Sequence, residues 1–392
     1  MRAAGQFIVA EFAANTMAVG CLPPSSVAMR TSWKLVVAFT ASLLAAVPAA
    51  AQLPTASGKQ IALANPAWKL FIPSNYHQRP GAVADLLVHF HGDSQTYWNN
   101  AKYANLNALI VTVNYSGLSS AYSTPFSNAS LFQTLVNDAL AKARAEANIP
   151  DALVWDKLGV SSFSAGYGAV REILKSATYR NDVDALLAAD SLYATTAGDQ
   201  TPVDSQMIDY KTFAALAKNG QKTFVYSHSL VPTYTYESTL ECGDELLQHL
   251  GVSASAYNVS GLGDLDFYRR AQAGNFRLYG AMGNDGDSHL EHLRWIGEFL
   301  EELPLAKIPT QSGDFNEDGY VNAADLVAWR SGYGPSSLAD ADDDNDTDGA
   351  DFLQWQRQVG AGGIAANPVP EPSTAALLLG AAAVGAALFI RH

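Results

Sequence analysis

The chain is poor in cysteine. Its 392 residues include two, and the first of these, Cys21, lies before or within an expected export signal. Cleavage of that signal would remove Cys21 and leave Cys242 as the single thiol of the mature chain. One thiol cannot form a disulfide framework, even in an exported protein. The sequence around Cys242 suggests no partner histidine, so we interpret this residue as a partly buried structural thiol.

Positive charge is also scarce. Lys and Arg together number 24 against 38 Asp and Glu, which gives a formal net charge of −14. A negative surface repels phosphate backbones, so we expect no nucleic-acid partner. No nicotinamide-binding or phosphate-binding glycine loop is present, and we expect no cofactor for catalysis. Hydrophobic residues make up 48% of the chain, which is ample for a packed core.

An export signal is expected at residues 29–51, within an N-terminal extension of residues 1–52. Arg30 and Lys34 precede the apolar run 35–47, and three alanines at 49–51 come before Gln52. This order of a basic start, an apolar centre and small residues is typical of a secretory signal peptide. We therefore interpret residues 1–28 as an over-extended start. The alternative is a permanent N-terminal membrane helix, for which the apolar run is short.

A second apolar run, residues 375–390, stands near the C-terminus and is predicted to be a helix. Val-Pro-Glu-Pro-Ser at 369–373 precedes it, and Arg391 and His392 follow it. This tail, within a segment of linker and tail at 361–392, resembles the PEP-CTERM sorting signal. The resemblance implies contact with the membrane, processing by an exosortase-type enzyme and a cell-surface or extracellular location. The alternative is a permanent tail anchor, which also places the body of the protein outside the cytoplasm.

Two acidic loops form an internal repeat over residues 313–360. Residues 314–325 read DFNEDGYVNAAD and residues 340–351 read DADDDNDTDGAD, and an apolar helix is predicted after each loop. A hard cation takes six to eight oxygen ligands, which a twelve-residue loop supplies at alternating positions. We predict two Ca²⁺ sites with the ligands Asp314, Asn316, Asp318, Tyr320, Asn322 and Asp325 in the first loop, and Asp340, Asp342, Asp344, Asp346, Asp348 and Asp351 in the second.

The final ligand of each loop is Asp rather than the Glu of a sensor EF-hand, and no helix precedes the first loop. In both features the repeat resembles the type I dockerin, which implies a small all-α domain folded by calcium and a cohesin-like module as a possible partner. A structural spacer is the equal alternative. Trp329 and Trp355 occupy matching positions of the two helices. We interpret them as packing the two repeats together.

Residues 53–306 form the main predicted domain. Short apolar runs alternate with amphipathic stretches, which predicts an α/β fold with a doubly wound, mostly parallel sheet. In such sheets the chemistry collects at the carboxyl ends of the strands. The predicted strands are 85–91, 109–114, 158–162, 185–189, 223–226 and 276–279, and the predicted helices are 131–147, 167–176, 207–218, 241–249 and 289–303.

The junction after the strand 158–162 carries a candidate nucleophile. Ser164-Ala165-Gly166 passes from strand to helix, and a nucleophile elbow needs such a sharp turn between small residues. The fit to G-x-S-x-G is partial, because Ser162 replaces the first glycine. The alternative for Ser164 is an ordinary helix cap.

His89-Phe-His91-Gly92-Asp93 ends the first predicted strand and resembles the oxyanion loop of α/β-hydrolases. That resemblance implies an oxyanion hole formed by Gly92, Asp93 and Ala165. Alternation along a strand would place the side chains of His89 and His91 on one face, so a metal site is the alternative.

A histidine and an acid complete the candidate triad. His289 follows the last predicted strand at the start of a helix and is the candidate base, with His292 as the alternative. Asp190 ends the run 185–189 and is the candidate acid. The strand 223–226 offers no carboxylate at its end, and Glu237 and Asp244 are the alternatives to Asp190.

Together these features resemble the α/β-hydrolase family over residues 85–303. The resemblance implies acyl transfer to water by Ser164, His289 and Asp190. It predicts an exported serine hydrolase, most simply an esterase acting on small-molecule or polysaccharide-linked esters. A peptidase or amidase is not separated from an esterase by the sequence, and a non-catalytic surface-binding or scaffolding protein on the same fold is the other class. Several aromatic residues could stack on sugars or pack within loops: Tyr97, Trp98, Tyr115, Tyr122, Tyr234 and Tyr236.

Overall fold

The structure, a computed structural model, describes residues 53–79, 81–308, 312–316, 320–342 and 346–360. The expected export signal at 29–51 and the sorting tail at 361–392 lie outside the described residues, as do the predicted ligands Asp318 and Asp344. Among the helices that the structure does describe, none is both long and apolar enough to cross a bilayer.

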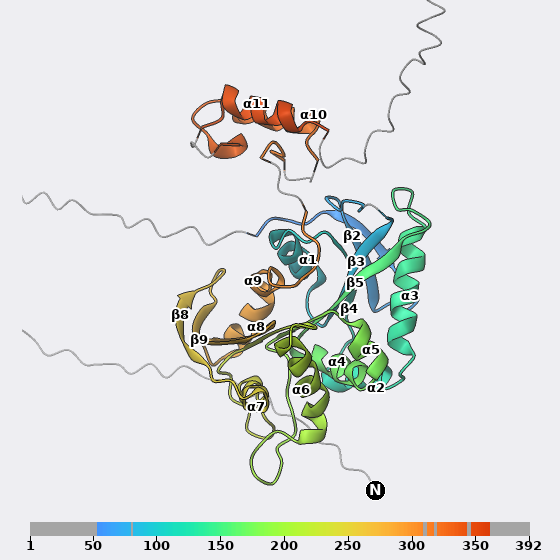
Figure 1. Ribbon diagram of the computed structural model, residues 1–392, viewed down its shortest axis with the longest axis vertical. Coiled ribbons are helices and arrows are strands. Elements are labelled where there is room, and N and C mark those ends of the chain that lie inside the picture. Colours follow the sequence, from blue (N-terminus) through green and yellow to red (C-terminus); the bar gives the residue numbers. More distant parts are fainter. Residues whose placement is uncertain (1–52, 80, 309–311, 317–319, 343–345, 361–392) are drawn as a thin grey trace, which may run out of the picture. The chain divides into compact units, whose positions relative to one another are not determined.

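A single mixed sheet organises the main domain (Figure 1). Its strands follow the order β1-β2-β4-β3-β5-β6-β7-β10-β9-β8, and the six from β4 to β10 run parallel. Antiparallel strands flank this parallel centre on both sides. The strands are β1 (Gly58–Ala62), β2 (Trp68–Pro73), β3 (Val83–Phe90), β4 (Ala108–Val113), β5 (Val154–Phe163), β6 (Ala185–Ala189), β7 (Thr223–His228), β8 (Ser255–Ser260), β9 (Asp266–Ala273) and β10 (Phe276–Ala281).

The parallel centre is the part that the sequence predicted. All six apolar runs are strands, and β4 and β6 are buried at every position. The antiparallel strands at the edges were missed. Five of the six side chains of β8 are exposed, and so are four of the five in β1. Such strands lack the continuous apolar run that marks a strand buried on both faces.

Helices cover both faces of the sheet (Figure 1). One apolar core lies under α2 to α7, and a second lies under α1 and α9. This doubly wound arrangement confirms the predicted fold class for the main domain. The helices are α1 (Ser94–Tyr103), α2 (Ser119–Phe126), α3 (Leu131–Arg144), α4 (Tyr167–Leu174), α5 (Ala177–Asp182), α6 (Asp204–Lys218), α7 (Thr239–Leu250), α8 (Gly286–Arg294) and α9 (Gly297–Leu300).

Three aromatic residues that the sequence placed in loops lie inside the protein. Tyr97 and Trp98 belong to α1, Tyr122 belongs to α2, and the exposed fraction of each side chain is 2% or less. The stacking interpretation is therefore wrong for these three, because their rings fill the core. Tyr234 is 91% exposed and Tyr236 is 46% exposed, so these two keep an accessible face. Cys242 is fully buried in α7, and burial raises the pKa of its thiol.

The acidic repeats fold as two similar units, in which α10 (Ala323–Gly332) follows the first loop and α11 (Gly349–Gln358) follows the second. A short 3₁₀ turn, η2 (Ser337–Ala339), lies between the two helices. The indole N–H of Trp329 donates to the carbonyl of Asp348 at 2.7 Å, and that of Trp355 donates to the carbonyl of Asn322 at 2.8 Å. Each tryptophan therefore bonds to the start of the other helix, which fits the predicted packing role.

We predict that Gly166→Ala destabilises the main domain by about 1–3 kcal/mol. Gly166 has a helical φ of −60°, so alanine suits its backbone, but a Cβ there would lie 2.1 Å from the carbonyl oxygen of Phe90. Thermal unfolding of the purified chain measures the change. Gly198→Ala is the matched control, because a Cβ at Gly198 meets no atom within 4 Å. Equal melting temperatures for the two variants would contradict the proposed close contact.

Candidate functional site

Ser164 occupies a strained turn at the carboxyl end of β5. It opens a short 3₁₀ turn, η1 (Ser164–Gly166), which leads directly into α4. Its φ of +47° is a left-handed conformation that residues other than glycine seldom adopt. Such a strand-to-helix turn lifts a serine hydroxyl clear of the backbone. The close approach of Gly166 to the carbonyl of Phe90 lets the turn pack against β3.

The structure brings His289 and Asp190 together. Asp285 caps α8 by accepting from the N–H of Ser288 at 2.9 Å, and His289 lies in the first turn of that helix. The Nδ1 atom of His289 is 2.6 Å from Oδ2 of Asp190, which directly follows β6. The Asp190 side chain is 1% exposed and that of His289 is 19% exposed. The alternative acid Asp244 instead forms an ion pair with Arg269.

Three further groups donate hydrogen bonds to the Asp190 carboxylate. Ser229 contributes its backbone N–H at 2.9 Å and its hydroxyl at 2.7 Å, and the hydroxyl of Thr239 is the third donor. Burial raises the pKa of Asp190, but the neighbouring imidazoles of His292 and His289 and the hydrogen bonds from His289 and Thr239 together bring it below its usual range. The carboxylate is therefore ionised at neutral pH and can orient His289.

The imidazole of His289 also packs beside the candidate nucleophile. Its ring stacks on that of Phe163, the residue before Ser164, with 4.7 Å between the centroids. Because Nδ1 bonds to Asp190, Nε2 is the atom left for proton transfer. No hydrogen bond joins the Ser164 hydroxyl to His289 within the described residues, and such bonds are often long before substrate binds.

One predicted oxyanion donor is already engaged. The backbone N–H of Gly92 donates to the Oδ1 atom of Asn114 at 3.0 Å, which contradicts a free donor at Gly92 in this conformation. The side chain of Asp93 caps α1 by accepting from the N–H of Thr96 at 2.8 Å. The backbone N–H groups of Asp93 and Ala165 remain the predicted donors.

The alternative of a metal site at His89 and His91 is wrong in this structure. The strand β3 ends at Phe90, and His91 has a φ of +72°, so the two histidines no longer alternate along one strand. The Nδ1 atom of His89 is 2.8 Å from the hydroxyl of Ser161, and that of His91 is 2.9 Å from the hydroxyl of Tyr122. Burial lowers the pKa of His89 to about 3, so His89 is a neutral core residue.

His292, the alternative base, points into the interior. It is fully buried, and its Nδ1 atom is 2.8 Å from the hydroxyl of Ser227. Burial lowers its pKa to about 4, against the opposing effect of the Asp190 charge. The geometry therefore favours His289, which alone of the two bonds to Asp190.

The sequence did not identify Ser229, Thr239 or Asn114 as parts of the site. Ser229 and Thr239 contact Asp190, and Asn114 contacts Gly92. Each pair is far apart in the sequence, so residue spacing did not reveal it. The one available signal was the polar pair Ser227-His228 at the end of β7, a strand that is otherwise apolar and buried. Polar side chains buried at the carboxyl end of a parallel strand need partners there.

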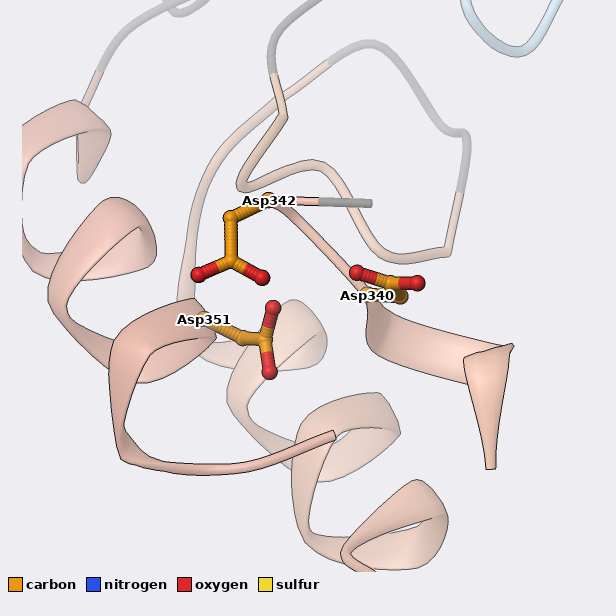
Figure 2. Close-up of side chains that lie close together, drawn as sticks. All are labelled: Asp340, Asp342 and Asp351. Atoms are coloured by element: carbon orange, nitrogen blue, oxygen red, sulfur yellow. The ribbon is translucent and has the colours of Figure 1, made fainter. Parts of the chain in front are cut away.

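The acidic loops bring carboxylates together as well. In the second loop, carboxylate oxygens of Asp340, Asp342 and Asp351 lie within 4.8 Å of one another (Figure 2). A second such group joins Asp346 and Asp348 to Asp351. The all-oxygen donor set suits a hard cation such as Ca²⁺.

The final aspartate of each loop accepts hydrogen bonds from backbone N–H groups of its own loop. Asp325 and Asp351 are fully buried, and each closes a capping box at the start of its helix. In the first loop, Asp325 accepts from the N–H of Asn316 at 3.2 Å and from the N–H of Asn322 at 2.7 Å. In the second loop, Asp351 accepts from the N–H of Asp348 at 2.6 Å. These bonds fix the last position of each loop in the same orientation.

No known protein-family profile matches this chain, and no curated protein sequence matches it significantly. Solved structures do align with it. A cold-adapted esterase from an Arctic intertidal metagenomic library is 12% identical, with 64% of this chain and 93% of that chain covered and a TM-score of 0.34. A feruloyl esterase module from Clostridium thermocellum is 12% identical, with 64% and 91% covered and a TM-score of 0.35. A siderophore hydrolase from Aspergillus nidulans is 11% identical, with 66% and 99% covered and a TM-score of 0.34.

We predict that Thr239→Val lowers the free energy of unfolding by about 2 kcal/mol at pH 7, because it removes a hydrogen bond to a buried carboxylate. The folded pKa of Asp190 is lowered, so this stabilisation is present above the unfolded pKa of about 4 and fades as the pH falls through the folded pKa. Urea unfolding at pH 7 and at about pH 4 measures the difference, which should persist at both pH values because the folded carboxylate is still ionised. Thr212→Val, at an exposed residue, is the control. A loss in Thr239→Val no larger than that in Thr212→Val would contradict the hydrogen bond to the carboxylate.

Proposed function

We propose that this protein is a serine hydrolase that cleaves carboxylic esters through Ser164, His289 and Asp190. The observation that carries the proposal is the 2.6 Å hydrogen bond between His289 and Asp190, formed at the same end of the sheet as the left-handed turn of Ser164. A strained serine, an oriented histidine and a buried carboxylate are the parts from which an activated nucleophile is built. Their chain order, Ser then Asp then His, is that of α/β-hydrolases.

In the proposed reaction, Nε2 of His289 removes the proton of the Ser164 hydroxyl as the serine oxygen attacks the ester carbonyl. The bond to the leaving alcohol then breaks, and His289 returns the proton to that alcohol. Water repeats the sequence on the acyl-enzyme and releases the acid. Asp190 stays ionised throughout and stabilises the imidazolium. The N–H groups of Ala165 and Asp93 bind the oxyanion.

The wider assignment follows from the proposed segments at 29–51 and 361–392, which lie outside the described residues, and from the acidic repeats. An export signal and a PEP-CTERM-type tail would carry the hydrolase to the cell surface, where an exosortase-type enzyme would process the tail. A dockerin-like domain would join it to a cohesin-like module or act as a spacer. Esters linked to polysaccharide would be accessible substrates there, alongside small-molecule esters. The same site could act on amides, so a peptidase is the second candidate activity.

We predict that the full chain is labelled by a fluorophosphonate probe and that Ser164→Ala abolishes the labelling, because the probe bonds to an activated serine oxygen. His289→Asn should abolish it as well. Asp190→Asn should slow it by roughly 10⁴-fold, since the imidazole would take the wrong tautomer.

Two exposed residues outside the site supply the controls, and Ser127→Ala and His249→Asn should label normally. Gel fluorescence after probe treatment gives the rates, and turnover of p-nitrophenyl acetate reports the ester reaction. A well-folded chain that takes up no probe would overturn the proposed triad and favour a non-catalytic binding protein.

We also propose that the acidic repeats bind two Ca²⁺ ions. The convergence of Asp340, Asp342 and Asp351 supports the second site, and the matching surroundings of Asp325 and Asp351 support the first. Bound calcium would neutralise carboxylates that otherwise repel one another, and so would stabilise the loops ahead of α10 and α11.

We predict that calorimetric titration of the calcium-free chain with Ca²⁺ shows two bound ions. Asp342→Asn removes one charged ligand of the second loop and should weaken that site by roughly tenfold or more, while the first site keeps its affinity. Asp199→Asn, an exposed change in a loop of the main domain, is the control. Absence of binding heat in the unmodified chain, or an unchanged isotherm in Asp342→Asn, would contradict the calcium sites.

A further inference from the structure

One buried hydroxyl joins the strand that carries the acid to the turn that carries the nucleophile. Ser191 follows Asp190 and has no exposed surface. Its Oγ atom donates toward two acceptors: the carbonyl oxygen of Ser164 at 2.9 Å and the hydroxyl oxygen of Ser162 at 2.8 Å. A serine has one proton to donate, so the two acceptors share it.

The carbonyl that Ser191 contacts belongs to a peptide group of direct importance to the site. A peptide group is planar and trans, so the C=O of Ser164 and the N–H of Ala165 lie in one plane and point in opposite directions. A donor that holds the carbonyl in place therefore fixes the direction of the Ala165 N–H. That N–H is one of the two remaining predicted donors to the oxyanion.

The turn needs such support, because its backbone is strained on both sides of the bond. Ser164 has a φ of +47° and Asp190 has a φ of +42°. Left-handed conformations in residues other than glycine persist only where their surroundings hold them. The backbone of the acid is itself held, since the Asp190 N–H donates to the carbonyl of Ser227 at 3.0 Å. Ser191 is therefore anchored on one side and free to restrain Ser164 on the other.

We propose that Ser191 is a positioning residue, which orients the Ala165 N–H toward the oxyanion by holding the Ser164 carbonyl. The inference rests on the proposed hydrolase function. It also gives a reason for the serine at position 162, where the elbow motif has glycine. The Ser162 hydroxyl accepts from Ser191 at 2.8 Å. Among the described residues, Ser191 and not Ser162 is the side chain that donates to the Ser164 carbonyl.

The two serines give a sharp test, because deleting either hydroxyl breaks the same Ser162–Ser191 contact, whereas only Ser191→Ala frees the Ser164 carbonyl. Complete loss of an oxyanion donor lowers kcat by about 10²–10³-fold. A misdirected donor loses part of that effect, so we expect Ser191→Ala to lower kcat for p-nitrophenyl acetate by roughly tenfold or more, with KM changed less than about threefold. Fluorophosphonate labelling should slow in parallel. Ser162→Ala should lower kcat by less than about threefold, because the Ser191 proton then goes wholly to the carbonyl.

Ser161→Ala is the matched control for the loss of a buried hydroxyl. Ser161 lies in β5 directly before Ser162 and is fully buried, but its hydroxyl contacts His89 and Tyr97 and not the turn at Ser164. It should change the melting temperature and leave kcat unchanged. Equal losses of kcat in Ser191→Ala and Ser162→Ala, or a loss in Ser191→Ala that appears only in KM, would overturn the positioning role.

Hydrogen–deuterium exchange separates this inference from the proposed function. Backbone amides of residues 163–168 should exchange faster in Ser191→Ala than in the unmodified chain or in Ser161→Ala, whether or not the protein is active. An unmodified chain that takes up no probe would remove the hydrolase assignment, and the exchange data would still decide whether Ser191 holds the turn. Unchanged exchange in Ser191→Ala would show that it does not.

Discussion

The contact between His289 and Asp190 is the constraint on which the site depends. It joins the first turn of α8 to the carboxyl end of β6, two segments separated by 99 positions in the chain. A buried carboxylate is costly unless donors surround it, and Asp190 has Ser229 and Thr239 in addition to His289. The same donors that stabilise the charge also fix its orientation. The acid can therefore hold the imidazole in one tautomer without moving.

Burial gives the neighbouring histidines a different role. His89, His228 and His292 are fully buried, and burial lowers their pKa values to about 3, 3 and 4. They are neutral at physiological pH and serve as hydrogen-bonding core residues. His289 instead combines a hydrogen bond to the Asp190 carboxylate with a partly exposed side chain. Of these four histidines, His289 is therefore the one suited to proton transfer.

Backbone strain is concentrated where the strands end. Ser164, Asp190 and His91 all have positive φ values, and each directly follows a parallel strand: β5, β6 and β3 respectively. Such turns redirect the chain within a single residue, which places side chains above the edge of the sheet. The tight contact of Gly166 with Phe90 and the hydrogen bond of Ser191 with Ser164 supply the restraint that this strain requires. Packing and hydrogen bonding around the turn therefore help to hold Ser164 in its left-handed conformation.

The sequence by itself determined the parallel centre of the sheet and the helices α3, α4, α6 and α7, because buried strands leave continuous apolar runs and amphipathic helices leave a 3.6-residue period. The predicted helix 289–303 is divided into α8 and α9, and the short helices α1, α2 and α5 were not predicted. It also singled out Ser164, Asp190 and His289, since each stands where a strand-like run ends or a helix begins. The exposed edge strands left no such runs and escaped prediction. Only the tertiary structure decided that Asp190 rather than Asp244 bonds to His289, that His292 turns inward and that Asn114 occupies the Gly92 N–H. These choices depend on distances between segments far apart in the chain, which residue spacing does not encode.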